Sequence, residues 1–338
     1  MKKRISNKLI TTIMVISVIL SLLAAGCSNN EQKKTAAETT GKKYDVLKIP
    51  TTVDFTRPDI FELGEQLGFF EEEGIKFERI GAVPAPQLVA AVVAGKIDIG
   101  AAHFGRTIAG ISAGAKIKAV VAGTETTQKI PHMVIITTAK SPIKTAQDLV
   151  GKKIGIPTIG GCNEYTPYAY MTKNGIDNPK SKVEVIVMPE SNLEQALRQG
   201  DIDAAAMHKN PEVITASGEL RLLFTDYDVW GSDGGGTPFY FSEKFIQEKP
   251  DVVRRFVAAV AKTNNWANAN EQKAIDMTVE KNKLDPKSLR TGHFGPDGII
   301  KAETAQIWID LLTQYGEIKP GLQANQVYTN EFNPFAKK

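Results

Sequence analysis

Two stretches of the chain share one pattern, and this repeat constrains the fold more than any other feature. Residues 87–101 place apolar residues at helical spacing, then Gly95, then Ile97-Asp98 and a short run of small residues. Residues 193–206 repeat this order around Gly200. A glycine suits the left-handed position that ends a helix, and a small apolar strand after such a helix is expected to be buried in a parallel sheet. The repeat therefore predicts two similar units.

The segments before each unit also correspond, which extends the repeat into two α/β halves. Each half alternates strand, helix and strand, and this order predicts an open sheet. We expect an α/β fold with two lobes, each an open, mostly parallel sheet flanked by helices, and a ligand in the cleft beyond the carboxyl ends of the strands. The alternative is a chance repeat of a common pattern. The expected strands are 46–49, 76–80, 153–156 and 183–188, and the expected helices are 61–72 and 165–174.

The tail after Phe241 has amphipathic helical patterns and is expected to return to the first lobe, so that the chain crosses between lobes twice. The predicted domains are therefore lobe I, residues 44–139 plus 242–335, and lobe II, residues 140–241.

The N-terminus has the layout of an export signal. Four basic residues within the first eight precede an apolar run from Leu9 to Ala25, and no acidic residue appears before Glu31. We assign residues 1–26 to a signal peptide. The alternative is a membrane-spanning helix, but the run is short of the ~20 apolar residues that a span needs.

The end of this run, Leu23-Ala24-Ala25-Gly26-Cys27, resembles the lipobox of bacterial lipoproteins. The resemblance implies that Cys27 is acylated, so that the protein is anchored at the outer face of the cell membrane. Residues 27–43 are polar and predicted to be a flexible tether. Cys162 is then the remaining cysteine of two, which rules out an internal disulfide bond.

The positive charge of the chain belongs largely to the signal peptide. The whole chain carries +3, and removal of the four basic residues in the first 26 leaves −1. No basic patch with interleaved aromatic residues is present, so the sequence gives no indication of nucleic-acid binding.

Four segments resemble the periplasmic substrate-binding proteins of ABC importers for nitrate, sulfonate and taurine. This resemblance implies the two-lobe clamshell of the type II periplasmic-binding-protein fold, with a permease and its ATPase as partners. We expect the protein to be a monomer. It names no ligand, because the family covers sulfonates, nitrate, bicarbonate and several vitamin precursors. The segments are 95–100, 141–155, 200–204 and 248–256.

Loops that follow the expected strands supply the candidate ligand-binding residues. Paired glycines let a ligand approach the backbone, and the first amides of the following helix attract anions. An arginine can fork onto an oxyanion, although a solvated arginine at a helix start is the alternative. Glu164 either contacts the ligand or caps its helix. The candidates are Asp54, Phe55, Arg57, His103, Phe104, Arg106, Gly160, Gly161, Cys162, Asn163, Glu164, His208, Asn210 and Trp230.

Two histidines occupy matching places in the repeat, since His103 follows Gly95 by eight residues and His208 follows Gly200 by eight. We expect them to face each other across the cleft. Three roles remain open: metal binding, with Asp54, Glu164 and Cys162 completing the shell; hydrogen bonding to a neutral ring; or, when protonated, attraction of an anion.

The function predicted from these features is capture of a small organic or inorganic anion, similar to sulfonate or nitrate, for an ABC importer. A neutral heteroaromatic ligand, such as a pyrimidine or flavin precursor, is the first alternative. An enzyme resembling the thiamine-pyrimidine synthase is the second, but its cysteine-rich iron motif is absent. We therefore assign no catalytic residue, no cofactor and no metal ligand.

Overall fold

The computed structural model describes residues 43–53, 55–286 and 289–336. The predicted signal peptide, the lipidation site Cys27 and nearly all of the predicted tether lie outside the described residues, as does Asp54. No helix in these described ranges combines the length and the apolar character that a membrane span requires.

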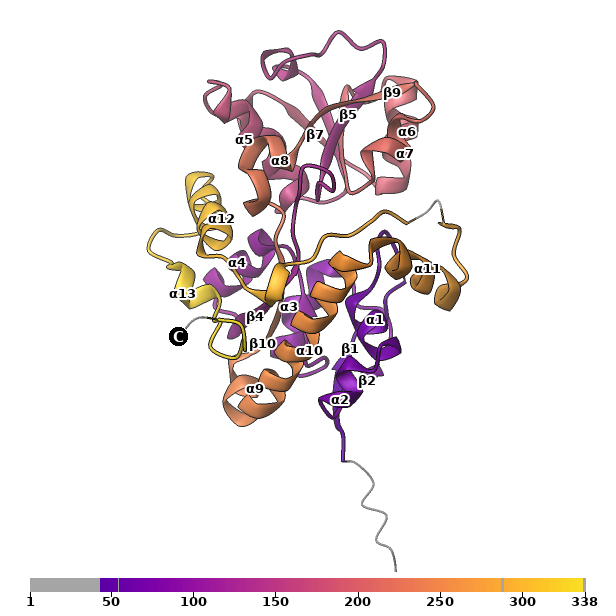
Figure 1. The fold of residues 1–338 in the computed structure, drawn as a ribbon. Helices are drawn as coiled ribbons and strands as arrows, with labels where there is room; N and C mark the ends of the chain where they lie inside the picture. The colour runs from indigo at the N-terminus through magenta and orange to yellow at the C-terminus, as the bar shows by residue number, and fades with distance from the viewer. Residues whose placement is uncertain (1–42, 54, 287–288, 337–338) are drawn as a thin grey trace, which may run out of the picture. The chain divides into compact units, whose positions relative to one another are not determined.

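One sheet has five strands in the order β7-β6-β8-β5-β9 (Figure 1). β6 pairs in parallel with β7 and β8, whereas β5 runs antiparallel to β8 and β9. The strands are β5 (Val134–Thr138), β6 (Lys153–Ile156), β7 (Glu184–Val187), β8 (Ala204–Met207) and β9 (Leu220–Thr225).

The other strands form a parallel pair, β1-β2, and a three-stranded antiparallel sheet, β3-β10-β4. The pair is joined to the segment before β3, because the amide of Asp98 donates to the carbonyl of Lys48 over 2.8 Å. These strands are β1 (Asp45–Ile49), β2 (Ile75–Arg79), β3 (Gly100–Ala101), β4 (Ile117–Thr124) and β10 (Thr237–Ser242).

The repeat is present in the structure. Its helices, α3 (Leu88–Val93) and α6 (Glu190–Gln199), are followed by Gly95 at φ 67° and Gly200 at φ 79°, the left-handed values that favour glycine. β8 is buried along its whole length and pairs in parallel with β6, as expected. β3 differs, because its partner β10 runs antiparallel to it.

The α/β fold with two lobes is confirmed, with two differences in detail. The sheets are not mostly parallel. The five-stranded sheet is mixed because β5 runs antiparallel to both of its neighbours, and the three-stranded sheet is antiparallel because β10 runs antiparallel to β3 and β4. The chain also changes sheet earlier than residues 139 and 241, since β5 belongs to the five-stranded sheet and β10 to the three-stranded one. The two crossings are therefore the segments 125–133 and 226–236.

Helices cover the sheets (Figure 1). The helices that follow β10 pack on helices and strands from the N-terminal part of the chain. The long α10 contacts β4 and α1, and α12 contacts α4. The helix expected at 61–72 is divided at Gly68, where φ is 77°. The remaining helices are α1 (Ile60–Gln66), α2 (Phe69–Glu72), α4 (Phe104–Ser112), α5 (Cys162–Lys173), α7 (Pro211–Thr215), α8 (Asp226–Trp230), α9 (Glu243–Glu248), α10 (Pro250–Ala269), α11 (Glu271–Asn282), α12 (Ala302–Gln314) and α13 (Ala324–Val327).

Candidate functional site

A cavity of about 380 Å³ lies where loops from both sets of strands meet. Arg57 follows β1, His103 follows β3, Thr158 follows β6 and His208 follows β8. The cavity is thus beyond the carboxyl ends of four strands, the place expected for a ligand in an open α/β sheet. Its lining is Thr56, Arg57, Ala85, Leu88, Ala101, Ala102, His103, Arg106, His132, Pro157, Thr158, Gly161, Cys162, Asn163, Glu190, His208 and Thr237.

Three of the chain's four histidines meet at this cavity. The ring of His132 lies between the other two, with centroids 5.2 Å from His103 and 4.9 Å from His208. The repeat predicted that His103 and His208 face each other across the cleft, and both line this cavity. No sequence feature indicated His132. That residue comes from the first crossing, which has no counterpart in the repeat.

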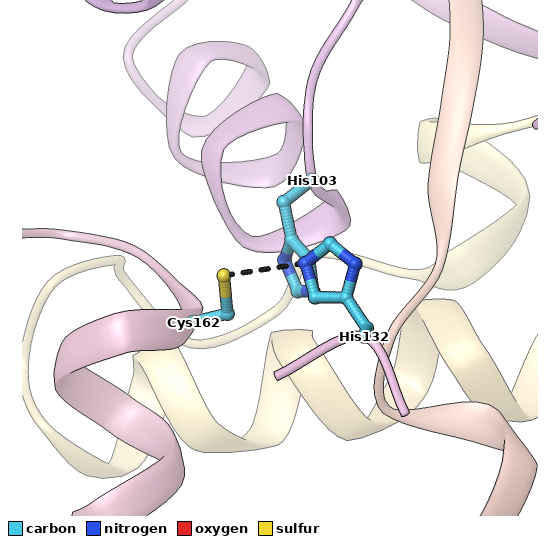
Figure 2. A group of neighbouring side chains, drawn as sticks. All are labelled: His103, His132 and Cys162. Atoms are coloured by element: carbon cyan, nitrogen blue, oxygen red, sulfur yellow. Dashed lines mark hydrogen bonds between the residues drawn. The ribbon is translucent and has the colours of Figure 1, made fainter. Parts of the chain in front are cut away.

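The thiol of Cys162 contacts two of these rings. Its Sγ is 3.6 Å from Nε2 of His132 and 3.4 Å from Nε2 of His208. The dashed line in Figure 2 marks the contact with His132. Cys162 is the first residue of α5 and is only 6% exposed. The start of α5 therefore places a sulfur donor beside two imidazoles.

Glu190 orients His208. Its Oε1 accepts from the backbone amide of His208 over 2.7 Å, and its Oε2 lies 3.2 Å from Nδ1 of the ring. Burial acts to lower the pKa of His208, but contact with Cys162 and Glu190 outweighs it and raises that pKa to about 9. The ring nitrogen that faces Cys162 is Nε2, so the carboxylate, the imidazole and the sulfur form a chain.

His103 is held by backbone groups on both sides of its ring. Nδ1 accepts from the amide of Gly105 over 3.2 Å and so caps α4, and Nε2 lies 3.1 Å from the carbonyl of Gly234. Burial lowers the pKa of His103 to about 3, and burial also keeps the pKa of His132 well below its ordinary value. Both imidazoles are therefore neutral at physiological pH.

A network that we call the clasp (Thr126, His132, Met133 and Asp226) fixes the position of His132. The amide of His132 donates to Oγ1 of Thr126 over 2.8 Å, and this hydroxyl in turn donates to Asp226. The amide of Met133 donates to the other oxygen of Asp226 over 3.1 Å. Because Asp226 begins the second crossing, the clasp joins the two crossings.

Arg290 supports the same segment from outside the clasp. Its Nη1 donates to the carbonyls of Pro131 and His132, over 2.8 and 3.2 Å. Burial lowers the pKa of Arg290 to about 10, which still leaves the guanidinium charged at neutral pH. The backbone of His132 is thus held by both its amide and its carbonyl.

Arg57 and Arg106 bring positive charge to the cavity. Nη2 of Arg106 is 3.4 Å from Oγ1 of Thr158, in the loop before α5. Burial lowers the pKa of Arg57, but an arginine remains protonated at neutral pH. Among the described residues, no carboxylate lies within ion-pair distance of either guanidinium.

The start of α5 adds hydrogen-bond donors to this region. Its N-cap residue, Gly161, offers no side-chain hydrogen bond, and a Cβ at Gly161 would be 3.7 Å from Nη2 of Arg106. Glu164 is buried and accepts from the amide of Gly160 over 2.8 Å. Glu164 thus ties the loop before α5 to the first turn of the helix.

The other candidate residues differ in whether they line the cavity, an adjoining cavity or neither. Asn163 lines it while donating to the carbonyl of Ala206, and Phe55 and Asn210 line an adjoining cavity of about 390 Å³ that shares Glu190 and His208. Phe104 is 2% exposed and packs in the core, and the ring of Trp230 lies 5.4 Å from that of Trp308. Neither aromatic ring lines the cavity.

Ten residues of the cavity lining were not among the sequence candidates, and five of them are polar. His132, Glu190 and Thr158 are described above, and Thr56 and Thr237 add hydroxyl groups. A glutamate at a helix start ordinarily interacts with the helix dipole, so Glu190 gave no distinct signal. Thr56 precedes the candidate Arg57 in the sequence, and this proximity was the one indication that Thr56 could line the cavity.

The profile of the NMT1/THI5-like family matches residues 60–274, which is more than half of the chain. The chain belongs to the NMT1/THI5-like family. A protein of Brucella abortus (strain 2308) that is named as a binding protein is 23% identical over 301 residues, which cover 85% of this chain and 91% of that protein.

Solved structures confirm the periplasmic-binding-protein fold that the sequence predicted. The alkanesulfonate-binding protein SsuA from Xanthomonas axonopodis pv. citri, bound to MOPS, gives a TM-score of 0.64 at 20% identity and covers 85% of this chain and 99% of its own. The periplasmic nitrate-binding protein NrtA from Synechocystis PCC 6803 gives 0.64 at 11% identity, with coverage of 86% and 87%.

Proposed function

We propose that this protein is the extracytoplasmic solute-binding component of an ABC importer and that it captures a small anion. The observation that carries this proposal is the pair Arg57 and Arg106, which line one cavity. No carboxylate of the described residues lies within ion-pair distance of either, although Asp59 attracts Arg57 from farther away. A desolvated charge is costly unless it is paired. A bound anion would supply that pair, together with hydrogen bonds from the start of α5.

The composition of the cavity argues against a neutral heteroaromatic ligand. Of the described residues, none that lines the cavity is phenylalanine, tyrosine or tryptophan. The aromatic rings in this lining are the imidazoles of His103, His132 and His208. A neutral ligand would leave both guanidinium groups unpaired. This composition favours the anion over the pyrimidine or flavin precursor.

The names of the structural neighbours support the transport role, because one binds alkanesulfonate and another binds nitrate. Delivery to a permease with its ATPase, export, and anchoring through a lipid on Cys27 belong to the same proposal. They rest on the N-terminal sequence and on the family. We propose a monomer as the functional unit.

The experiment is a thermal-shift panel on the full-length protein with sulfonates, nitrate, carboxylates, pyrimidines and flavins. A ligand at a hundred times its dissociation constant stabilises the folded state by ~2.7 kcal/mol, which raises the melting temperature measurably. We expect one class of anion to give this shift. A shift with uncharged rings alone would overturn the proposal and establish the heteroaromatic alternative.

A further inference from the structure

Four donors suited to a transition metal meet in the cavity: the sulfur of Cys162 and the imidazoles of His103, His132 and His208. Donor atoms of His103, His132 and Cys162 all lie within 4.8 Å of one another (Figure 2). His208 approaches the same sulfur at 3.4 Å. Anion capture by the arginines gives no reason for this concentration of nitrogen and sulfur donors around one point.

The spacing around the sulfur agrees with tetrahedral coordination. Metal–sulfur bonds of ~2.3 Å and metal–nitrogen bonds of ~2.0–2.1 Å place sulfur and nitrogen ligands about 3.6 Å apart at the tetrahedral angle. The observed separations from Cys162 Sγ are 3.6 Å to His132 and 3.4 Å to His208. These two sulfur–nitrogen separations are close to those of ligands that share one ion.

One of the imidazoles has the outer contact that holds a metal-bound histidine in place, and the backbone of a second is fixed. Metal-bound histidines commonly donate their second ring nitrogen to a carboxylate, and Glu190 lies 3.2 Å from Nδ1 of His208. The backbone of His132 is fixed by the clasp and by Arg290. His103 differs, because both of its ring nitrogens already contact backbone groups.

The donor set selects the class of metal. Thiolate and imidazole ligands favour zinc, copper and nickel, whereas magnesium and calcium require mostly oxygen ligands. The cavity's carboxylate, Glu190, is engaged by His208, so its oxygens act on the histidine rather than towards the sulfur.

We propose that the cavity binds one transition-metal ion of this class through Cys162, His132 and His208, with the fourth position open. Arg57 and Arg106 line the same cavity, so an anion that coordinates the ion could also pair with the guanidinium groups. The captured solute is then a metal–anion complex. This second part rests on the proposed function, whereas the metal site does not.

The series of contacts from Glu190 to His208 to Cys162 also has the order found in thiol hydrolases, where one imidazole activates the sulfur. A nucleophile needs one such contact. Here a second imidazole, His132, reaches the sulfur from another segment, and its own backbone is fixed by an independent network. A second positioned imidazole is what a metal requires, and this favours coordination over catalysis.

The test is metal binding by the full-length protein, prepared without a histidine tag and treated with chelator. Zinc affinity is measured by competition with a chromophoric chelator, and cobalt is added to detect a thiolate-to-metal charge-transfer band. The parent is expected to bind one equivalent and to show the band. Cys162→Ser should abolish the band, and His132→Ala and His208→Ala should each lower zinc affinity by more than about 100-fold, because outer contacts alone contribute roughly 10- to 100-fold.

Two control variants make the result specific. His293→Ala removes the histidine outside the cluster and is expected to leave metal affinity unchanged. His103→Asn keeps a side-chain acceptor for the cap of α4 and is expected to change affinity less than tenfold. Circular dichroism of every variant shows whether it is folded. The proposed site is refuted if the folded parent binds no metal. It is also refuted if the variants of Cys162, His132 and His208 lose no more metal affinity than His293→Ala does.

The anion panel, repeated with and without zinc, separates this inference from the proposed function. Anion binding that requires or tightens with zinc supports the metal–anion complex. Anion binding that zinc leaves unchanged contradicts the complex and leaves the proposed function intact. Metal binding without any anion binding would retain the site and refute anion capture.

Discussion

Asp98 and Asp203 hold equivalent strands in the two halves of the chain by the same pair of hydrogen bonds. Oδ2 of Asp98 accepts from the amide of Lys48 over 2.7 Å, and Oδ2 of Asp203 accepts from the amide of Lys153 over 2.8 Å. Each aspartate amide returns a bond to the carbonyl of the same lysine. The Ile-Asp of the sequence repeat is therefore the point where each repeat unit joins the first strand of its half, β1 or β6.

This equivalence predicts additive losses of stability. Asp98→Ala and Asp203→Ala should each lower the free energy of unfolding by about 1 kcal/mol, because each removes one side-chain acceptor from a backbone amide. The double variant should lose the sum, since the two sites share no partner. Urea unfolding measures all three, and a double variant no worse than either single one would contradict the equivalence.

Arg106→Ala should weaken binding of the anion identified by the panel by roughly 10- to 150-fold, which corresponds to the ~1.5–3 kcal/mol of a charge-assisted hydrogen bond. Calorimetry of parent and variant measures the change. Arg254→Ala is the matched control, because Arg254 is exposed and does not line the cavity. Equal affinity in all three proteins would show that Arg106 does not contact the anion.

The adjacent glycines of the α5 loop should respond in opposite ways. Gly161→Val should leave the melting temperature nearly unchanged but weaken anion binding more than about tenfold, because its methyl groups would press on Arg106 and fill the cavity. Gly160 has φ 75° and open space around a Cβ, so Gly160→Ala should cost about 1 kcal/mol of stability and change binding little. Thermal unfolding and calorimetry together test this reversal.

Burial of Asp226, a member of the clasp, makes stability depend on pH. Burial raises the pKa of Asp226 to about 6, above the ~3.9 of an unfolded chain. Its contribution to stability is therefore full below the unfolded value and is lost as pH rises through 6. Between pH 7.5 and 5, the metal-free parent should gain roughly 1 to 1.5 kcal/mol relative to Asp226→Asn. Parallel pH curves for the two proteins would contradict the shift.

Cys27→Ser should abolish lipid attachment. The basic start, the apolar run and the Gly26-Cys27 junction motivate this prediction. Incorporation of a labelled fatty acid and fractionation of membranes measure it. A serine variant that is processed and retained on membranes like the parent would refute the lipoprotein assignment.

The parts of the fold that follow local rules could be predicted from the sequence. Apolar spacing gave the positions of β1, β6 and α6, and Gly95 and Gly200 gave the helix ends. The sheet that a strand joins is decided by tertiary pairing. β5 and β10 are similar apolar segments whose sequences do not identify their partners, so the crossings were placed too late.

The candidate site likewise combines residues that local sequence patterns predict with residues that only the tertiary structure brings together. His103 and His208 were found because the repeat gives each a position after a buried strand. His132 lies in a crossing that occurs once, and only the tertiary structure brings it to Cys162. Phe104 and Trp230 were candidates because they lie in loops expected near the cleft. The position of a residue in such a loop does not determine whether its ring points into a cavity or into the core.

The clasp also provides a spectroscopic reporter for the crossings. The amides of His132 and Met133 donate to side-chain oxygens of two buried residues, so neither proton can exchange with solvent until Thr126 and Asp226 separate from this segment. Deuterium uptake at these two amides therefore measures the free energy of opening the crossings. Uptake as slow as in β8 would mean that the crossings come apart only when the whole protein unfolds, and faster uptake would identify a local opening event.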